Sequence, residues 1–160
     1  MQNFFLEYRN IIIFAHIISA VIWVGGMVAM RYAAHPSFMQ IVSPADRLEK
    51  ISLALKRLFF IVLPFVMLLA LTGAILSISY DIKHTDFHYL THLKELIWGL
   101  MFINLVSMIL RRNKADKAML EGDFNKAREM LELIGKYMVP INIALGSIAI
   151  FLGATLRVHL

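Results

Sequence analysis

The sequence predicts an all-α integral membrane protein: a four-helix bundle with cytoplasmic helical extensions. Of its 160 residues, 59% are hydrophobic and only 17% are charged, and the mean hydropathy is +0.70. Soluble domains are about half apolar and about a quarter charged. The apolar residues fall into four blocks, each close to the roughly 20 residues that cross a bilayer. We therefore expect a single transmembrane domain over residues 1–160.

Four spans are predicted, at about residues 11–34, 59–80, 92–110 and 138–156. The first is too long for the core of a signal peptide and no small-residue cleavage site follows it, so we expect a retained helix. Inside the spans, Pro64 and Pro140 each remove one backbone hydrogen bond and favour a kink. Asn104 and Asn142 are expected to form interhelical hydrogen bonds. These polar positions are the main interruptions of the apolar blocks.

The basic residues predict the orientation. Most of the 16 Lys and Arg residues lie between spans one and two or between spans three and four. The basic residues of these two connections are Arg31, Arg47, Lys50, Lys56, Arg57, Arg111, Arg112, Lys114, Lys117, Lys126, Arg128 and Lys136. Basic segments stay on the cytoplasmic side during insertion, so both termini are expected outside the cytoplasm, in a cytoplasmic (inner) membrane. The same distribution explains the net charge of +5 without nucleic acid, and the expected partner is membrane lipid.

The two basic connections are predicted to be largely helical. Ser43-Pro44-Ala45-Asp46 offers an N-cap, a proline at the first helical position and an early carboxylate. Gly122-Asp123 predicts a turn before the fourth helix. Spans two and four are therefore expected to project from the membrane as longer helices.

Ionisable side chains inside a span are costly, so each marks a candidate functional site. His16 in span one, His92 and Lys94 in span three, and Arg157 at the end of span four are predicted to lie at similar depth in the outer leaflet. His92 and Lys94 are two positions apart, about 200° around a helix, so only one of them is expected to share the site fully with His16. The alternatives are a histidine at headgroup level and a lysine that snorkels to the interface.

Metal-binding patterns are also present. His84, His88 and His92 form an i, i+4, i+8 series, and two histidines at i, i+4 on a helix can bind a transition metal, although a solvated loop is an alternative reading. Met27 and Met30 are potential thioether ligands for Cu(I), with core packing as the alternative. The chain has no cysteine, which excludes thiolate sites and iron–sulfur clusters.

Helix one has a distinctive face. Trp23 follows His16 by seven residues, so both lie on one side of the helix, and Gly25-Gly26 lets a neighbouring helix or a flat ligand approach the backbone. No nucleophile–base arrangement and no phosphate-binding glycine loop is visible in the sequence. This argues against a hydrolase or a nucleotide-driven pump.

These motifs resemble two related membrane families across all four helices. Ala15-His16 with Trp23-Val24-Gly25-Gly26 is similar to helix one of the CopD copper-resistance membrane domain and, together with Arg31, to HemJ-type protoporphyrinogen oxidases. Thr72-Gly73 and Leu93-Lys94 fit both families.

Other motifs separate the two families. His92-Leu93-Lys94 is closer to HemJ, and Arg111-Arg112 is closer to CopD. HemJ proteins usually have a Pro-Arg pair and a tyrosine–histidine at the end of helix one, where this chain has Met30-Arg31-Tyr32 and Ala34-His35-Pro36. The departure favours an unspecialised member of the wider group.

The HemJ resemblance implies haem b with His16 as an axial ligand. Lys94 is then the opposite ligand, if burial keeps its amine neutral, or a substrate-facing base, while His92 is the more conventional opposite ligand. Arg157 would pair with a propionate, and Gly26 would make room for the macrocycle. The implied activity is an oxidoreductase that passes electrons from a membrane-soluble donor to a quinone or another acceptor, with porphyrinogen oxidation as the specific version.

The CopD resemblance implies copper transport or delivery instead, through His16, His92, Met27 and Met30. A third reading is a non-catalytic assembly partner in which buried polar residues only specify helix pairing. A homo-oligomer is compatible with each of the three readings.

Overall fold

The computed structural model describes residues 2–80 and 88–159, and within them the side chains of residues 5–80 and 88–156. Its elements are α1 (Gln2–Ala29), the π-helix η1 (Met30–Ala34), α2 (His35–Phe38), α3 (Pro44–Ser79), α4 (His88–Leu120), α5 (Phe124–Leu133), the π-helix η3 (Ile134–Met138) and α6 (Val139–His159). No strand occurs in the part of the chain that is described.

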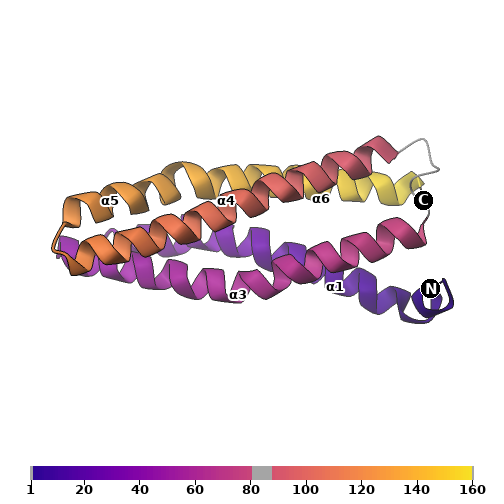
Figure 1. Cartoon of the computed structure of the whole chain (residues 1–160), viewed down its shortest axis with the longest axis horizontal. Helices are drawn as coiled ribbons and strands as arrows, with labels where there is room; N and C mark the ends of the chain where they lie inside the picture. Colours follow the sequence, from indigo (N-terminus) through magenta and orange to yellow (C-terminus); the bar gives the residue numbers. More distant parts are fainter. Residues whose placement is uncertain (1, 81–87, 160) are drawn as a thin grey trace.

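These elements form four long rods, which confirms the all-α, multi-pass membrane fold. The rods Phe5–Phe38, Pro44–Ser79, His88–Leu120 and Phe124–Leu156 are each long and apolar enough to cross a membrane. They run side by side, with both chain termini at one end, here called the terminal end (Figure 1). The opposite end, called the loop end, carries residues 39–43 and the turn between α4 and α5.

The predicted extensions at the loop end are confirmed. Ser43 caps α3, its side chain accepting a hydrogen bond from the backbone N–H of Asp46 at 3.3 Å, and Pro44 occupies the first turn. Gly122 adopts a positive φ of 78°, and the Asp123 side chain then caps α5. The prediction missed one extension, because α4 also continues past residue 110 to Leu120.

Each π-helix is followed by a proline at the same spacing. η1 ends at Ala34, two residues before Pro36, and η3 ends at Met138, two residues before Pro140. Proline lacks an N–H and its ring crowds the carbonyl four residues earlier, and the wider π turn accommodates this without ending the rod. Pro64 lies inside α3, as expected.

The tightest packing lies between the middle of the bundle and the loop end. Met27, Val62 and Leu105 are fully buried there, and Met30 joins the same hydrophobic core. A Cβ atom on Gly26 would lie 2.9 Å from Leu58 Cδ1, so this glycine allows α3 to approach α1. The expectation that Gly26 makes room for a macrocycle is not supported, because a neighbouring helix already fills the space beside it.

The two intramembrane asparagines link α4 to the fourth rod, as predicted. Asn104 Nδ2 donates to Asn142 Oδ1 and to the carbonyl oxygen of Met138, both at 2.8 Å. Asn142 Nδ2 donates in return to the carbonyl oxygen of Met101 at 3.3 Å. Each asparagine side chain thus forms its amide hydrogen bonds across the helix interface, where no lipid has to replace them.

Candidate functional site

A cavity of about 320 Å³ lies in the terminal half of the bundle and is lined by residues of α1, α3, α4 and α6. Its walls are mostly apolar, with a small number of polar side chains. This volume is at the lower end of the range of about 300–1,000 Å³ that is typical of ligand and cofactor sites. The cavity is therefore the candidate functional site.

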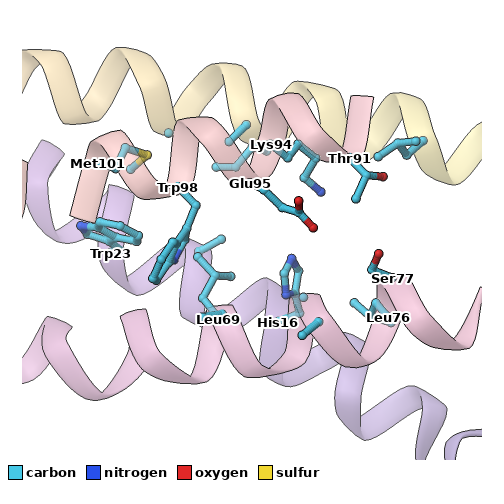
Figure 2. A pocket seen from close by; sticks show the side chains of 18 of the residues that line it. His16, Trp23, Leu69, Leu76, Ser77, Thr91, Lys94, Glu95, Trp98 and Met101 are labelled. Atoms are coloured by element: carbon cyan, nitrogen blue, oxygen red, sulfur yellow. The ribbon is translucent and has the colours of Figure 1, made fainter. Parts of the chain in front are cut away.

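His16 and Lys94 reach this cavity from opposite sides. His16 comes from α1 and Lys94 from α4, and their side chains point toward one another across the open space (Figure 2). This is the convergence that the sequence predicted for these two residues. Both side chains are partly buried.

The neighbours of His16 hold its imidazole in place. Its Nδ1 lies 2.9 Å from Thr72 Oγ1 on α3, and the backbone of Leu69 on the same helix is a second hydrogen-bond partner of the ring. A Cβ atom on Gly73 would lie 3.4 Å from His16 Cε1, so the ring packs directly against the α3 backbone. Among the described residues, no hydrogen bond to Nε2 itself is formed.

Lys94 also depends on a glycine. A Cβ atom on Gly153 of α6 would lie only 3.1 Å from Lys94 Nζ, so this glycine leaves space for the end of the lysine side chain. Among residues 5–80 and 88–156, no hydrogen bond or ion pair to Nζ is formed. The amine is thus available to a ligand in the cavity.

The inner end of the cavity is aromatic and closely packed. Trp23 from α1 is 1% exposed, and Trp98 from α4 stacks on Phe102 with ring centroids 5.2 Å apart. Both indole Nε1 atoms are buried without a hydrogen-bond partner in the described structure. Buried tryptophan N–H groups usually find a partner.

The outer end of the cavity is more polar and open. Glu95 and Ala74 line the cavity yet are exposed, so the open side lies between α4 and α3. Ser77 and Thr91 lie at the same end (Figure 2). Thr91 Oγ1 is also buried without a partner among the described residues. A ligand at this end would therefore meet hydroxyl and carboxylate groups.

The structure places His92 outside the cavity, so Lys94 is the one of the two that shares the cavity with His16. The His92 side chain is 63% exposed, and its Nδ1 lies 3.2 Å from Glu95 Oε2. The physical reason is the helical offset: α4 turns Lys94 inward and therefore turns His92 outward. The expected metal pair of His16 and His92 is not assembled, and the described residues contain no group of three His, Cys, Asp or Glu side chains suited to a metal ion.

The other predicted site residues are distributed as follows. Trp23 lines the cavity on the same side of α1 as His16, whereas Met27 and Met30 lie in the hydrophobic core. The side chains of Arg157 and His84 lie outside the described residues. His88 contacts the His92 ring edge to face, with centroids 6.2 Å apart, on the outside of the bundle.

Sequence reasoning missed the α4 face that lines the cavity. Thr91, Trp98 and Met101 lie three residues before, four after and seven after Lys94, so all four share one side of the helix. Glu95 is the next residue around the same helix. Counted from Thr91, the i, i+3, i+4, i+7 spacing gives Lys94, Glu95 and Trp98, and Met101 follows seven residues after Lys94.

Comparisons of the chain with family models, with curated proteins and with solved structures find no match. The geometry alone defines what the site offers. It combines, among the described residues, one imidazole nitrogen and one amine without hydrogen-bond partners, aromatic and glycine walls, and an opening on one side.

Proposed function

We propose that the chain is a haem b-binding oxidoreductase or electron-transfer protein of the membrane. The observation that carries the proposal is the convergence of His16 and Lys94 from two helices on one apolar cavity. Four-helix bundles commonly hold cofactors between facing helices. Porphyrinogen oxidation is the specific version that the HemJ resemblance favours.

The residues of the cavity fit a porphyrin. His16 Nε2 forms no hydrogen bond with the described residues and is the available nitrogen for an axial bond. Gly73 and Gly146 line the cavity, and Trp23 and Trp98 supply flat apolar surface. When bound, haem supplies one-electron chemistry, and the protein sets its ligation and excludes water.

Lys94 has two compatible roles in this proposal. Its amine can pair with a propionate, which is a charge-assisted contact, or act on the substrate side of the cavity. The cavity is open between Ala74 on α3 and Glu95 on α4, so a ligand can extend beyond its volume. A donor or acceptor dissolved in the bilayer, such as a quinone or a porphyrinogen, would approach from that side.

The orientation belongs to the same proposal. The basic loop end would face the cytoplasm and the cavity would lie in the outer leaflet of the inner membrane, because basic segments are retained on the cytoplasmic side. Placing the cavity near the terminal end then puts the redox site close to the extracytoplasmic surface.

A visible absorption spectrum of the protein, purified after expression with a haem supply, tests the proposal. We expect a Soret band that His16→Ala removes. His92→Ala is the matched control, since that imidazole is exposed outside the cavity, and should leave the band intact. A colourless wild-type protein, or a band that His16→Ala leaves unchanged, would overturn the proposal.

Copper transport or delivery is the second candidate, and the same preparation tests it. A colourless protein that binds Cu(I), and loses it when Met27 and Met30 are replaced, would support this alternative. The structure gives Cu(I) poor access to the methionine pair, because Met27 is fully buried in the hydrophobic core. Neither Met27 nor Met30 lines the cavity, whereas Met101 does.

A further inference from the structure

Thr72 links His16 to the backbone of α3. It is buried, at 4% exposure, and its Oγ1 lies 2.9 Å from His16 Nδ1. The same hydroxyl donates to the carbonyl oxygen of Leu68 at 2.7 Å and, more weakly, to that of Leu69 at 3.2 Å. One hydroxyl group thus serves the imidazole on α1 and two carbonyl groups of its own helix.

The hydrogen count determines the direction of the bond to His16. A threonine hydroxyl has one hydrogen atom, and here the carbonyl oxygens of Leu68 and Leu69 share it. Toward the imidazole Oγ1 can therefore only accept, so Nδ1 must carry a hydrogen. A neutral imidazole has a single N–H, which leaves the lone pair on Nε2.

We propose that Thr72 is the positioning residue for His16: it fixes the neutral ring as the Nδ1–H tautomer, so that Nε2 presents its lone pair to a metal centre bound in the cavity. The choice of haem iron as that centre rests on the proposed function, whereas the tautomer does not. Metal-binding histidines typically have such a partner on the second ring nitrogen, and it fixes both tautomer and ring orientation.

Other hydroxyls in the bundle show that this arrangement is not the usual back-bonding of a helical residue. Ser19, Ser147 and Thr155 each donate to the carbonyl oxygen four residues earlier, as hydroxyls in membrane helices often do. Among the described residues, only Thr72 also receives a bond from a histidine ring on another helix. Its hydroxyl is therefore a specific orienting group for His16.

NMR of protein carrying isotope-labelled histidine tests the tautomer directly. The protein is purified without a haem supply and studied at alkaline pH, where free imidazoles are neutral. We expect the His16 signal, assigned by its absence in His16→Gln, to show a protonated Nδ1 and an unprotonated Nε2. Thr72→Val, which keeps the side-chain shape, should shift the ring toward the other tautomer, and Thr72→Ser should not.

Titration with haemin provides the second readout. Loss of such an orienting partner typically weakens metal-centre binding by about 10–100-fold, so Thr72→Val should raise the Kd by this factor while Thr72→Ser stays near wild type. Thr155→Val is the control, because it removes a back-bonded hydroxyl that has no histidine partner. Agreement of Thr72→Ser with wild type would show that the hydroxyl, and not the threonine methyl group, is what His16 requires.

The two proposals fail in different ways. An unprotonated Nδ1 in the wild type, or a tautomer that Thr72→Val leaves unchanged, would overturn the role of Thr72. An Nδ1–H tautomer that depends on Thr72, in a protein that binds no haemin, would support the positioning role and reject the proposed function.

Discussion

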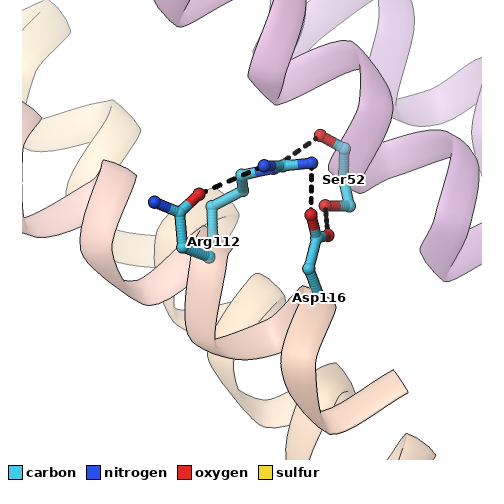
Figure 3. Close-up of polar contacts among 4 residues, drawn as sticks. Ser52, Arg112 and Asp116 are labelled. Carbon is cyan, nitrogen blue, oxygen red and sulfur yellow. Dashed lines mark hydrogen bonds and ion pairs between the residues drawn. The ribbon is translucent and has the colours of Figure 1, made fainter. Parts of the chain in front are cut away.

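The ion pair of Arg112 and Asp116 joins α4 to α3 near the loop end (Figure 3). Arg112 is 8% exposed, its Nη2 lies 2.5 Å from Asp116 Oδ2, and its Nε donates to the carbonyl oxygen of Ser52 at 3.1 Å. The Ser52 hydroxyl donates to the other carboxylate oxygen. Asp116 therefore holds a buried guanidinium of its own helix and a hydroxyl of the neighbouring one.

Asp116→Ala should destabilise the bundle because it leaves this guanidinium buried and unpaired. Removing one partner of a buried ion pair costs about 3–5 kcal/mol, whereas exposed pairs contribute about 0–1 kcal/mol. The side chains of Arg112 and Asp116 are 10% and 35% exposed, so water partly screens the carboxylate. We therefore expect a loss of about 2–3 kcal/mol in the free energy of unfolding.

Reversible unfolding in mixed micelles, followed by circular dichroism, measures the loss. Lys117→Ala is the matched control, because it breaks an exposed pair with Glu121 in the next position of the same helix and should cost less than about 0.5 kcal/mol. Replacing both Arg112 and Asp116 by Met and Leu should recover most of the loss, since no charge then stays buried alone. Equal costs for Asp116→Ala and Lys117→Ala, or a double variant less stable than Asp116→Ala, would refute this reasoning.

Two further substitutions test the packing of the bundle in the same unfolding assay. Gly146→Ala would place a Cβ atom 2.5 Å from Val24 Cγ2, so we expect a loss of about 1–3 kcal/mol in the free energy of unfolding. Adding Val24→Ala should restore part of this loss. Gly25→Ala is the control and should be close to neutral, because a Cβ atom there would meet no atom within 4 Å. Asn142→Leu removes the bond from Asn104 and should cost about 1–2 kcal/mol; an unchanged stability would show that the asparagine pair sets helix register without net stabilisation.

Local sequence signals predicted the fold well. The spans follow from hydropathy, and the cap at Ser43 and the turn at Gly122 follow from backbone chemistry that needs no tertiary contact. The asparagine pair was predictable because an amide inside a span has few partners besides another helix. The approach of His16 to Lys94 was predictable for a similar reason, since span boundaries and alternating helix direction fix the depth of each residue.

The rotation of each helix was not predictable from the sequence. In a soluble bundle, polar residues mark the outer face, but lipid-facing positions of α4 such as Leu96 and Ile103 are as apolar as buried Ile97. The pattern could not decide whether Lys94 or His92 faces inward. Gly26 shows the same limit, because a glycine beside a histidine face suits a flat ligand and a neighbouring helix equally well.

Helices α3 and α4 are in polar contact near one end and line the cavity near the other. Near the loop end, Arg112 and Asp116 on α4 hold Ser52 on α3, while toward the terminal end the two helices separate and both line the cavity (Figures 1 and 3).

His16 is likewise held by a polar contact between helices. Its ring is held by Thr72 on α3 rather than by a residue facing it across the cavity, so the orienting contact does not compete with a ligand. Lys94 has space beside Gly153 but no partner among the described residues. The site therefore combines one imidazole held by a neighbouring helix with one amine that has no partner among the described residues.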